Sequence, residues 1–195
     1  GWGRGDLAAP RPVLKVAARE FQTADGREYT IASVRPNDAG RLLDHVLRVH
    51  RTDPDADLPA EGELWSNADV LRQQIRQLTA AANGLYLMAT HGPGPIGALL
   101  LRGGNYLRLA HTTELGMSVR REWRRQGVGR SLVEVAVKAA RDSGDVRRIT
   151  LRVFESNEAA LALYEQLGFV VEGRQKRQVR IKGRYLDLIH MALDL

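Results

Sequence analysis

The sequence has no cysteine among its 195 residues. This absence excludes a disulfide framework, a thiolate metal site and a cysteine nucleophile, and the five scattered histidines lack the spacing of metal ligands, so we expect no metal. Long apolar runs are also missing: none approaches the ~18 residues that span a bilayer, and the glycine- and proline-rich start lacks the apolar core of a secretory signal. We therefore expect a cytoplasmic protein with no membrane partner.

Lysine is scarce, at 4 of the 29 basic residues, although the formal net charge is +6. The surplus is uneven, because residues 1–117 carry 13 basic and 13 acidic side chains whereas residues 118–195 carry 16 and 10. A local surplus suits one polyanionic ligand bound by the second half at least as well as it suits a nucleic-acid surface. No basic stretch is interleaved with aromatics, which make up only 6% of the chain, so we expect no nucleic-acid partner.

The length favours one globular domain, with 44% hydrophobic residues to build its core. Near the start, Val13–Phe21 and Tyr29–Val34 have the composition of strands and flank an Asp25-Gly26 hairpin turn. We therefore divide the chain into an N-terminal tail with an extra strand, residues 1–28, and the domain proper, residues 29–195.

Two helices are predicted after these strands. Asp38 is placed to cap the first helix, and either Ser66 or Asn67 is placed to cap the second. Their apolar faces consist of Leu42, Leu43, Val46 and Val49 in the first helix and of Val70, Leu71, Ile75 and Leu78 in the second.

The rest of the chain alternates strands and helices. The predicted elements are strands at 85–90, 96–102 and 112–119, a helix at 129–141, a strand at 149–154, a helix that Asn157 caps and Gly168 ends, and strands near 169–173 and 186–193. Turn residues join the first three strands, which predicts an antiparallel meander. The helix between the third and fourth strands predicts a βαβ unit, and the whole pattern a mixed α/β fold.

The segment between the strand that ends at Val119 and the following helix reads Arg124-Arg125-Gln126-Gly127-Val128-Gly129. Glycines here allow a tight turn and bring backbone N–H groups close to an anion, while the helix N-terminus adds roughly half a positive charge. The pattern therefore predicts a pyrophosphate cradle. A P-loop and a Rossmann fingerprint both fit poorly, because Gly129-Arg130-Ser131 lacks the lysine of the first and Leu132 replaces the third glycine of the second.

The spacing Arg/Gln-x-x-Gly-x-Gly/Ala resembles the cofactor loop of the GNAT superfamily of acetyl-CoA-dependent N-acetyltransferases. The resemblance begins near Tyr29, with Thr113–Val119 similar to the family's fourth strand and Asn157–Phe169 similar to its second cofactor-side motif. It implies a three-layer α/β fold in which a mostly antiparallel central sheet contains a βαβ cofactor-binding unit. It also implies acetyl-CoA as co-substrate and direct transfer of its acetyl group to a primary amine, without a covalent enzyme intermediate.

The same resemblance assigns cofactor-binding residues. Loop N–H groups would hold the pyrophosphate, backbone groups of Met117 and Val119 would pair with the pantetheine arm, and the Met117 N–H would donate to the thioester oxygen. The full set is Met117, Val119, Arg124, Arg125, Gln126, Gly127, Val128, Gly129, Arg130 and Asn157, the last as a partner of the pantetheine. Two alternatives stay open: a solvated basic loop for Arg124 and Arg125, and a simple helix N-cap for Asn157.

Two residues are candidates for proton transfer. Tyr164, two helical turns from Asn157, resembles the family's general acid, which protonates the departing thiolate; its alternative is a packed core aromatic. Glu114 matches a strand position from which some family members supply a base, and its alternatives are an ordinary sheet-face carboxylate or a substrate anchor. His111 is a weaker candidate base near the start of the same strand.

The amine acceptor, a small molecule or a peptide, is not identified by the sequence. We expect residues 38–83 and a strand connection at 175–185 to select it. An acidic loop either attracts a cationic acceptor or is merely solvated; its residues are Asp53, Asp55, Asp57, Glu61 and Glu63. A homodimer stays open, and the alternative function is a regulatory module that binds acyl-CoA without turnover.

Overall fold

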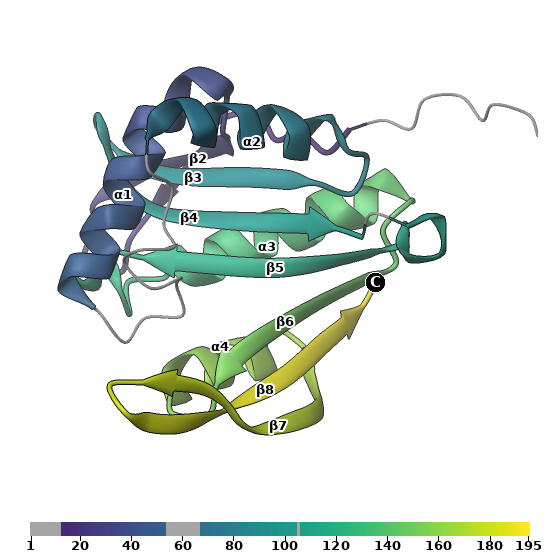
Figure 1. The fold of residues 1–195 in the computed structure, drawn as a ribbon. Coiled ribbons are helices and arrows are strands. Elements are labelled where there is room, and N and C mark those ends of the chain that lie inside the picture. Colours follow the sequence, from purple (N-terminus) through teal and green to yellow (C-terminus); the bar gives the residue numbers. More distant parts are fainter. Residues whose placement is uncertain (1–12, 54–66, 105) are drawn as a thin grey trace, which may run out of the picture.

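The strands of the protein form one sheet, seen in a computed structural model that describes residues 13–53, 67–104 and 106–195. The order is β1-β2-β3-β4-β5-β6-β8-β7, and all neighbours are antiparallel except β5 and β6 (Figure 1). The strands are β1 (Arg19–Gln22), β2 (Glu28–Ser33), β3 (Leu85–His91), β4 (Gly94–Gly103), β5 (Thr112–Val119), β6 (Arg148–Phe154), β7 (Val170–Ile181) and β8 (Arg184–Asp194). The predicted mixed α/β class, with a mostly antiparallel sheet and a βαβ unit, is confirmed.

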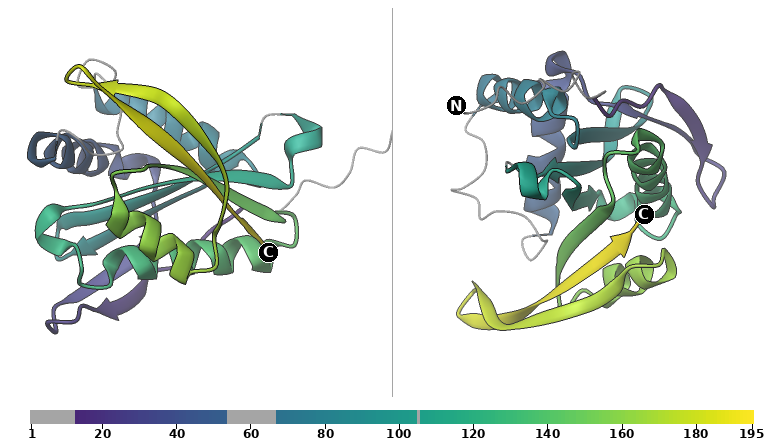
Figure 2. Two further views of the ribbon diagram at one scale, coloured as in Figure 1. Left: turned by 90° about the horizontal axis from the view of Figure 1, so that it is seen from below. Right: turned by 90° about the vertical axis from the view of Figure 1, so that its right-hand side faces the viewer.

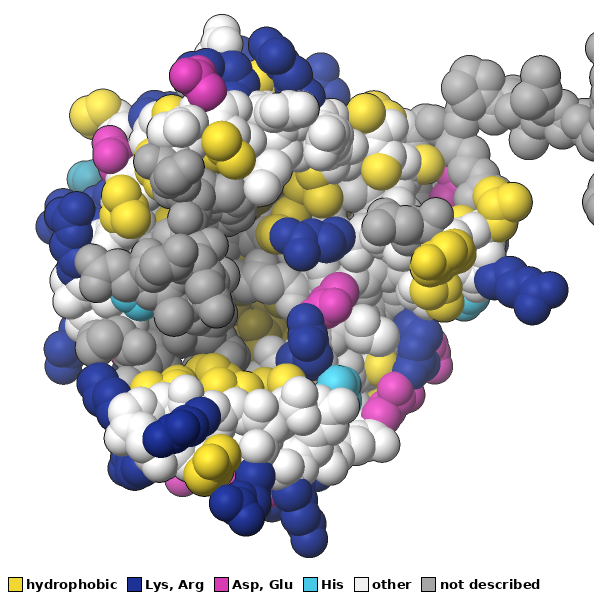
Figure 3. Space-filling view, in the orientation of Figure 1, with side chains coloured by type: hydrophobic (Ala, Val, Ile, Leu, Met, Phe, Trp, Pro, Cys, Tyr) yellow, Lys and Arg dark blue, Asp and Glu magenta, His cyan; other side chains and the backbone are white. Residues whose placement is uncertain are grey.

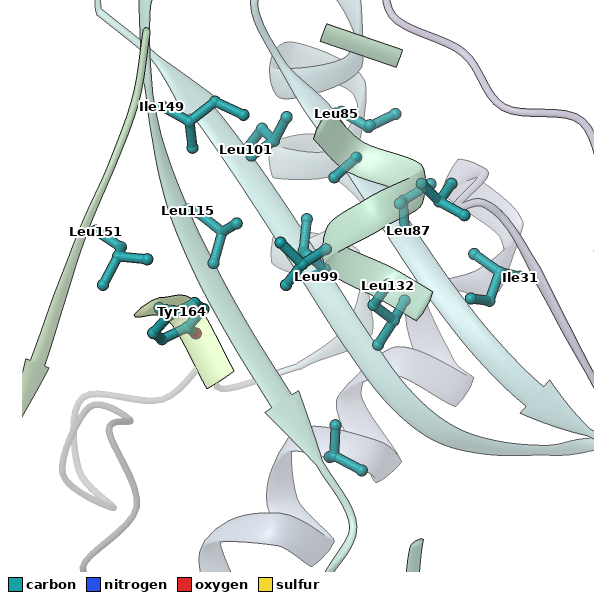
Figure 4. Packing of buried hydrophobic residues seen from close by; sticks show 14 of the residues in the cluster. Ile31, Leu85, Leu87, Leu99, Leu101, Leu115, Leu132, Ile149, Leu151 and Tyr164 are labelled. Atoms are coloured by element: carbon teal, nitrogen blue, oxygen red, sulfur yellow. The ribbon is translucent and has the colours of Figure 1, made fainter. Parts of the chain in front are cut away.

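Helices cover both faces of this sheet and complete three layers (Figures 1 and 2). The α-helices of the described residues are α1 (Ala39–Thr52), α2 (Ala68–Ala80), α3 (Val128–Ser143) and α4 (Glu158–Gln166). On the α3 and α4 side, the core contains inward-facing leucines of β3, β4 and β5 together with Leu132 and Tyr164 (Figure 4). On the α1 and α2 side, a second cluster joins Leu42, Leu71 and Ile75 to Tyr86 and Met88 of β3.

The predictions for α1 and α2 need two corrections, one at a helix start and one on a helix face. Asn67 caps α2 as predicted, because its side-chain oxygen accepts from the N–H groups of Asp69 and Val70, 3.0 Å each. Asp38 stands at the N-cap position of α1 but makes no cap bond there, since its carboxylate accepts from the Arg35 N–H at 2.9 Å. Val70 was expected on the apolar face of α2 and is instead 41% exposed. The alternative cap Ser66 lies outside the described residues.

Two strand predictions at the ends of the chain were wrong in length. The first strand begins only at Arg19, although Leu14 before it is buried in the main core. The expected connection at 175–185 is part of a long hairpin, because β7 continues to Ile181 and turns at Lys182 and Gly183, both with positive φ. The β7–β8 hairpin diverges from β5 as a separate arm of the sheet (Figures 1 and 2). The assignment of residues 1–28 as a tail and 29–195 as the domain stays a prediction.

Candidate active site

The parallel strands β5 and β6 pair for only four residues and then separate. Their register joins residues 112–115 to residues 148–151, and the remainder of each strand has no partner on that side. On its other edge β5 stays paired with β4, where the Arg120 N–H donates to the Ile96 carbonyl at 2.9 Å. Because hydrogen-bonded residues alternate along an antiparallel ladder, the backbone groups of Met117 and Val119 point away from β4 and into the gap.

A cavity of about 890 Å³ occupies this gap. It is lined by Met117, Ser118 and Val119 of β5, Val153 and Phe154 of β6, Arg121, Arg124, Arg125, Gly127, Gly129 and Arg130 of the loop and of α3, Ser156, Asn157, Ala159, Ala160, Leu163 and Tyr164 beside and within α4, and Val49 and Asp53. The gap therefore lies between a free strand edge and two helix N-termini. A hollow crosses the face of the molecule in the same region (Figure 3).

The loop before α3 has the backbone geometry that its glycines predict. Gly127 has φ +90° and forms the N-cap of α3, and a Cβ built on it would meet no protein atom within 4 Å. Since the first helical bond runs from the Ser131 N–H to the Gly127 carbonyl, the N–H groups of the first turn have no partner within the helix. A Cβ on Gly129 would lie 3.3 Å from Met117 Cε, so this glycine also permits close packing at the floor of the cavity.

The arginines predicted to bind the cofactor differ in their surroundings. The Arg124 side chain is engaged by the protein, since its Nε donates to the Val119 carbonyl at 2.9 Å and its guanidinium pairs with Asp53 at 2.6 Å. Arg130 reaches Gln166 with a 2.5 Å bond, and the exposed Arg125 has φ +58°. All three arginines line the cavity, which gives one side of it a positive surface.

Two further residues of the predicted set do not line the cavity. Val128 is buried in the core behind the loop. The Gln126 backbone carbonyl accepts from the Ala24 N–H at 3.3 Å. The buried side-chain Oε1 of Gln126 has no hydrogen-bond partner among the described residues. Any contact of Gln126 and Val128 with a ligand in the cavity would run through their backbone.

Asn157 and Tyr164 both line the cavity from α4. The Asn157 side chain accepts from the Ala160 N–H at 3.2 Å, so this residue is a helix N-cap as predicted and also faces the gap. Tyr164 is 6% exposed, and its ring packs edge-on against Phe169 with the centroids 5.6 Å apart. The structure thus brings both residues together with Met117 around one space.

Glu114 lies on the opposite face of β5 from the side chains of Leu115 and Met117, because side chains alternate along a strand. It does not line the cavity, and its carboxylate pairs with Arg152 of β6, at 2.6 and 2.7 Å. Gly116, next on this face, leaves open space, since a Cβ there would meet no atom within 4 Å. His111 precedes β5 at the end away from the gap.

His45 and Ser118, which were not singled out from the sequence, form a hydrogen-bonded pair on this same face of β5. His45 Nε2 lies 2.9 Å from Ser118 Oγ, while its buried Nδ1 has no hydrogen-bond partner among the described residues. Burial, with a smaller contribution from Arg120, lowers the pKa of His45 to about 4, so the ring is neutral at pH 7. His45 falls in the apolar stripe of α1 between Leu42 and Val49, a position typical of core residues.

The described residues lack the features of a metal centre and of a membrane-spanning helix. Within the described ranges, no group of three or more His, Asp or Glu side chains is placed to hold a metal ion. None of the helices in the part of the chain that the structure describes combines the length and the apolarity needed to span a bilayer. Of the predicted acidic loop, only Asp53 falls within the described residues.

Comparison with known proteins identifies the family. Residues 46–169 match the model of the acetyltransferase (GNAT) family. The chain is 28% identical over 129 residues to the L-amino acid N-acetyltransferase AaaT of Escherichia coli (strain K12), in an alignment that covers 66% of this chain and 74% of the relative. The acetyltransferase of GNAT family from Streptococcus pneumoniae matches with a TM-score of 0.79 and 25% identity, over 86% of this chain and 99% of that one.

A second solved structure carries the co-substrate. It is yncA of Salmonella typhimurium with its cofactor acetyl-CoA, which matches with a TM-score of 0.75 and 20% identity over 86% of this chain and 94% of that one. No relative supports the alternative of a regulatory module without turnover. Because the family match spans more than half of the sequence, the chain belongs to the GNAT family of acetyltransferases and transfers an acetyl group to an amine.

Proposed function

We propose that this enzyme binds acetyl-CoA in the gap between β5 and β6 and passes the acetyl group directly to a primary amine. The observation that carries the proposal is the early separation of the two strands, which leaves backbone groups of Met117 and Val119 facing a cavity of about 890 Å³. An extended amide chain such as pantetheine can add to such an edge as an extra strand. The solved yncA structure with acetyl-CoA supports this choice of co-substrate.

The pyrophosphate would lie on the N-terminus of α3. The N–H groups of its first turn lack partners within the helix, and Gly127 places no side chain between them and the cavity. Arg125 adds positive charge on the same side, while Asp53 partly neutralises Arg124 and Glu134, at 3.8 Å, partly neutralises Arg130. Helix N–H groups, the helix dipole and nearby guanidinium groups together favour a dianionic ligand. Asn157 lines the opposite wall, within reach of the pantetheine amides in this arrangement.

The transfer step needs one hydrogen-bond donor and one acid. The amine nitrogen attacks the thioester carbon, and the Met117 N–H donates to the carbonyl oxygen as negative charge builds on it. The C–S bond then breaks, and the nitrogen loses its second proton to solvent as the amide forms. The Tyr164 hydroxyl gives its proton to the departing thiolate, a small uphill step since thiols titrate near ~8.5 and phenols near ~10. The position of Tyr164 supports this role, because the residue lines the cavity together with Met117.

The amine must lose a proton before it attacks. Glu114 is our candidate to accept this proton, directly or through water, or to anchor the ammonium before it ionises. It lies on the face of β5 opposite the Met117 side chain, beside the open space over Gly116. The acceptor would therefore approach the thioester from the α1 and α2 side. The E. coli relative is named for L-amino acids, which supports a primary amine as acceptor.

Thiol release tests this function. The chain mixed with acetyl-CoA and a panel of primary amines should release CoA at a rate that saturates in both substrates, and calorimetry should give one acetyl-CoA site. Binding without thiol release from any amine would contradict the proposal. The cytoplasmic location stays a prediction, and so does the absence of membrane and nucleic-acid partners. The homodimer stays untested.

A further inference from the structure

Three charged side chains form a row across the sheet on the acceptor side of β5. Glu114 lies directly opposite Arg102 in the register of β4 and β5. Arg152 of β6 donates to Glu114 through both Nε and a terminal nitrogen, at 2.7 and 2.6 Å. The row therefore runs Arg102, Glu114, Arg152, with the acid between two cations.

The row lies where the two substrates would meet. Leu115 and Leu151 form the last pair of β5 and β6, so Arg152 is the first residue of β6 beyond the pairing. Met117, whose N–H we place at the thioester, is three residues beyond Glu114 along β5. Gly116 between them leaves the space over the strand open. A molecule held by the row would have its reactive group within reach of the gap.

The row is also accessible and unbalanced in charge. The side chains of Arg152 and Glu114 are 53% and 46% exposed, and charged side chains of both signs border the hollow of the molecular face (Figure 3). Arg102 is exposed and has no carboxylate partner among the described residues. Since Glu114 can neutralise one arginine, one guanidinium group of the row has no compensating carboxylate within residues 13–53, 67–104 and 106–195. A diamine or polyamine would meet this surplus with like charge, whereas an acceptor with its own carboxylate would offset it.

From this arrangement we infer that the acceptor is an α-amino acid with a free carboxylate, an inference that rests on the proposed function. In an α-amino acid one carbon separates the ammonium from the carboxylate. This spacing matches Glu114 and Arg102, which lie directly opposite each other on neighbouring strands. Glu114 receives the ammonium, and the carboxylate binds Arg102, with Arg152 holding Glu114 in place. A guanidinium group binds a carboxylate through two parallel hydrogen bonds, which fixes the orientation of the amine as well as its affinity.

The competing interpretation is a surface ion pair with no ligand. Exposed ion pairs add little to stability, so the contact of Glu114 with Arg152 alone would not require a ligand. That interpretation gives Arg102 no role in catalysis, and it predicts no preference between an amino acid and its carboxamide.

The experiment compares matched pairs of acceptors with the full chain and acetyl-CoA. Each pair is a free L-amino acid and its carboxamide, such as methionine and methioninamide, with apolar, acidic and basic side chains represented. The α-amino group of a carboxamide loses its proton at lower pH than that of the free amino acid. Rates are therefore compared at equal concentrations of the neutral amine. We expect kcat/KM to favour the acid at least tenfold, and calorimetry with the CoA-saturated chain to detect binding of the acid and not of the amide.

The variant Arg102→Gln then isolates the carboxylate contact. It should raise KM for the acid about tenfold or more, the scale of one lost charge-assisted hydrogen-bond pair, and leave the amide unchanged. Arg76→Gln, an exposed arginine of α2 outside the row, is the matched control and should change neither.

Two negative outcomes can be told apart. Equal rates for acid and amide, or an equal loss for both in Arg102→Gln, would overturn the inference and leave the acetyltransferase assignment intact. No thiol release with either member of any pair, despite acetyl-CoA binding, would remove the proposed function and this inference with it.

Discussion

On one side of β5, Leu115 and Met117 pack toward α3 and α4, and the free backbone edge of the strand faces a cavity with few charged neighbours other than loop arginines. On the other side, Glu114, Gly116 and Ser118 lie on the face of the sheet that carries α1 and α2, where an exposed row of charges and a buried histidine are found. The cofactor side thus offers backbone N–H groups and glycines. The acceptor side offers side chains that belong to different strands and helices.

This difference bears on how each substrate is recognised. Backbone groups bind any extended amide chain and any phosphate at the helix end, so the cofactor side needs only strand separation and a glycine loop. Side chains on several strands can change one at a time without altering the sheet. The acceptor side therefore sets specificity, and substitutions can be made on one side of β5 at a time.

The largest effect is expected on the cofactor side, from Gly127→Asn. Asparagine tolerates the positive φ of this residue, so the loop should fold, but its side chain would occupy the open space where we place the pyrophosphate. Losing two or three hydrogen bonds to a charged group at about 1.5 kcal/mol each corresponds to an acetyl-CoA affinity weaker by roughly 10²- to 10³-fold.

Gly144→Asn provides the matched control for that variant. Gly144 ends the same helix, has φ +70° and likewise has no atom within 4 Å of a built Cβ. Calorimetry should give this variant the affinity of the unmodified chain. An unchanged affinity in a folded Gly127→Asn variant would remove the loop from the cofactor site.

Tyr164→Phe should come next in size. The ring and its packing against Phe169 are kept, so the midpoint of thermal unfolding and the Kd for acetyl-CoA should change little. Losing the hydroxyl should lower kcat by ~10² or more, the usual scale for proton transfer by a positioned side chain. Turnover at the rate of the unmodified enzyme would leave Tyr164 as a packed core aromatic.

On the acceptor side, Glu114→Gln should have a smaller effect that depends on pH. Measured with an amino-acid carboxamide, whose amine has a pKa near ~8, loss of a base at Glu114 should lower kcat/KM at pH 7 only about tenfold, because about a tenth of that amine is already neutral. The loss should deepen at lower pH and shrink as pH rises. A pH profile of the same shape, merely displaced downward, would assign Glu114 to anchoring instead.

The smallest effect concerns the stability of the acceptor side. The pKa of His45 is about 4 in the folded chain, below its ordinary value of 6.5, because the ring is buried and Arg120 lies near it. Backbone groups of Ser118 and Pro95 oppose this shift, and Glu122 opposes it more weakly. The unfolded chain therefore binds the extra proton, and the stability contributed by the neutral ring is complete above pH 6.5 and is lost as pH falls toward 4. Urea unfolding should give about 1 kcal/mol less stability at pH 5.5 than at pH 7.

His45→Gln checks the cause of that loss. Glutamine can still reach Ser118 but does not titrate, so its stability should be nearly flat between pH 7 and 5.5. If the stability of this variant fell with pH as steeply as that of the unmodified chain, groups other than His45 would cause the pH dependence.

What the sequence could predict follows the same division. The glycine loop, the Asn157 cap and the strand at 112–119 have local signals, and the structure has each of them where it was expected. The row of Arg102, Glu114 and Arg152 depends on the register of three strands, which no local pattern specifies. The length of β7 was missed because residues 175–181 are polar and lack an apolar stripe.

The central claim is that the free edge of β5 binds acetyl-CoA, and amide hydrogen exchange tests it residue by residue. The N–H groups of Met117 and Val119 face the gap, whereas that of Ser118 faces β4 in the ladder and serves as an internal control. Saturation with acetyl-CoA should slow exchange at Met117, Val119 and residues 128–130 and leave Ser118 nearly unchanged. Tight binding with unaltered exchange at Met117 and Val119 would contradict the account.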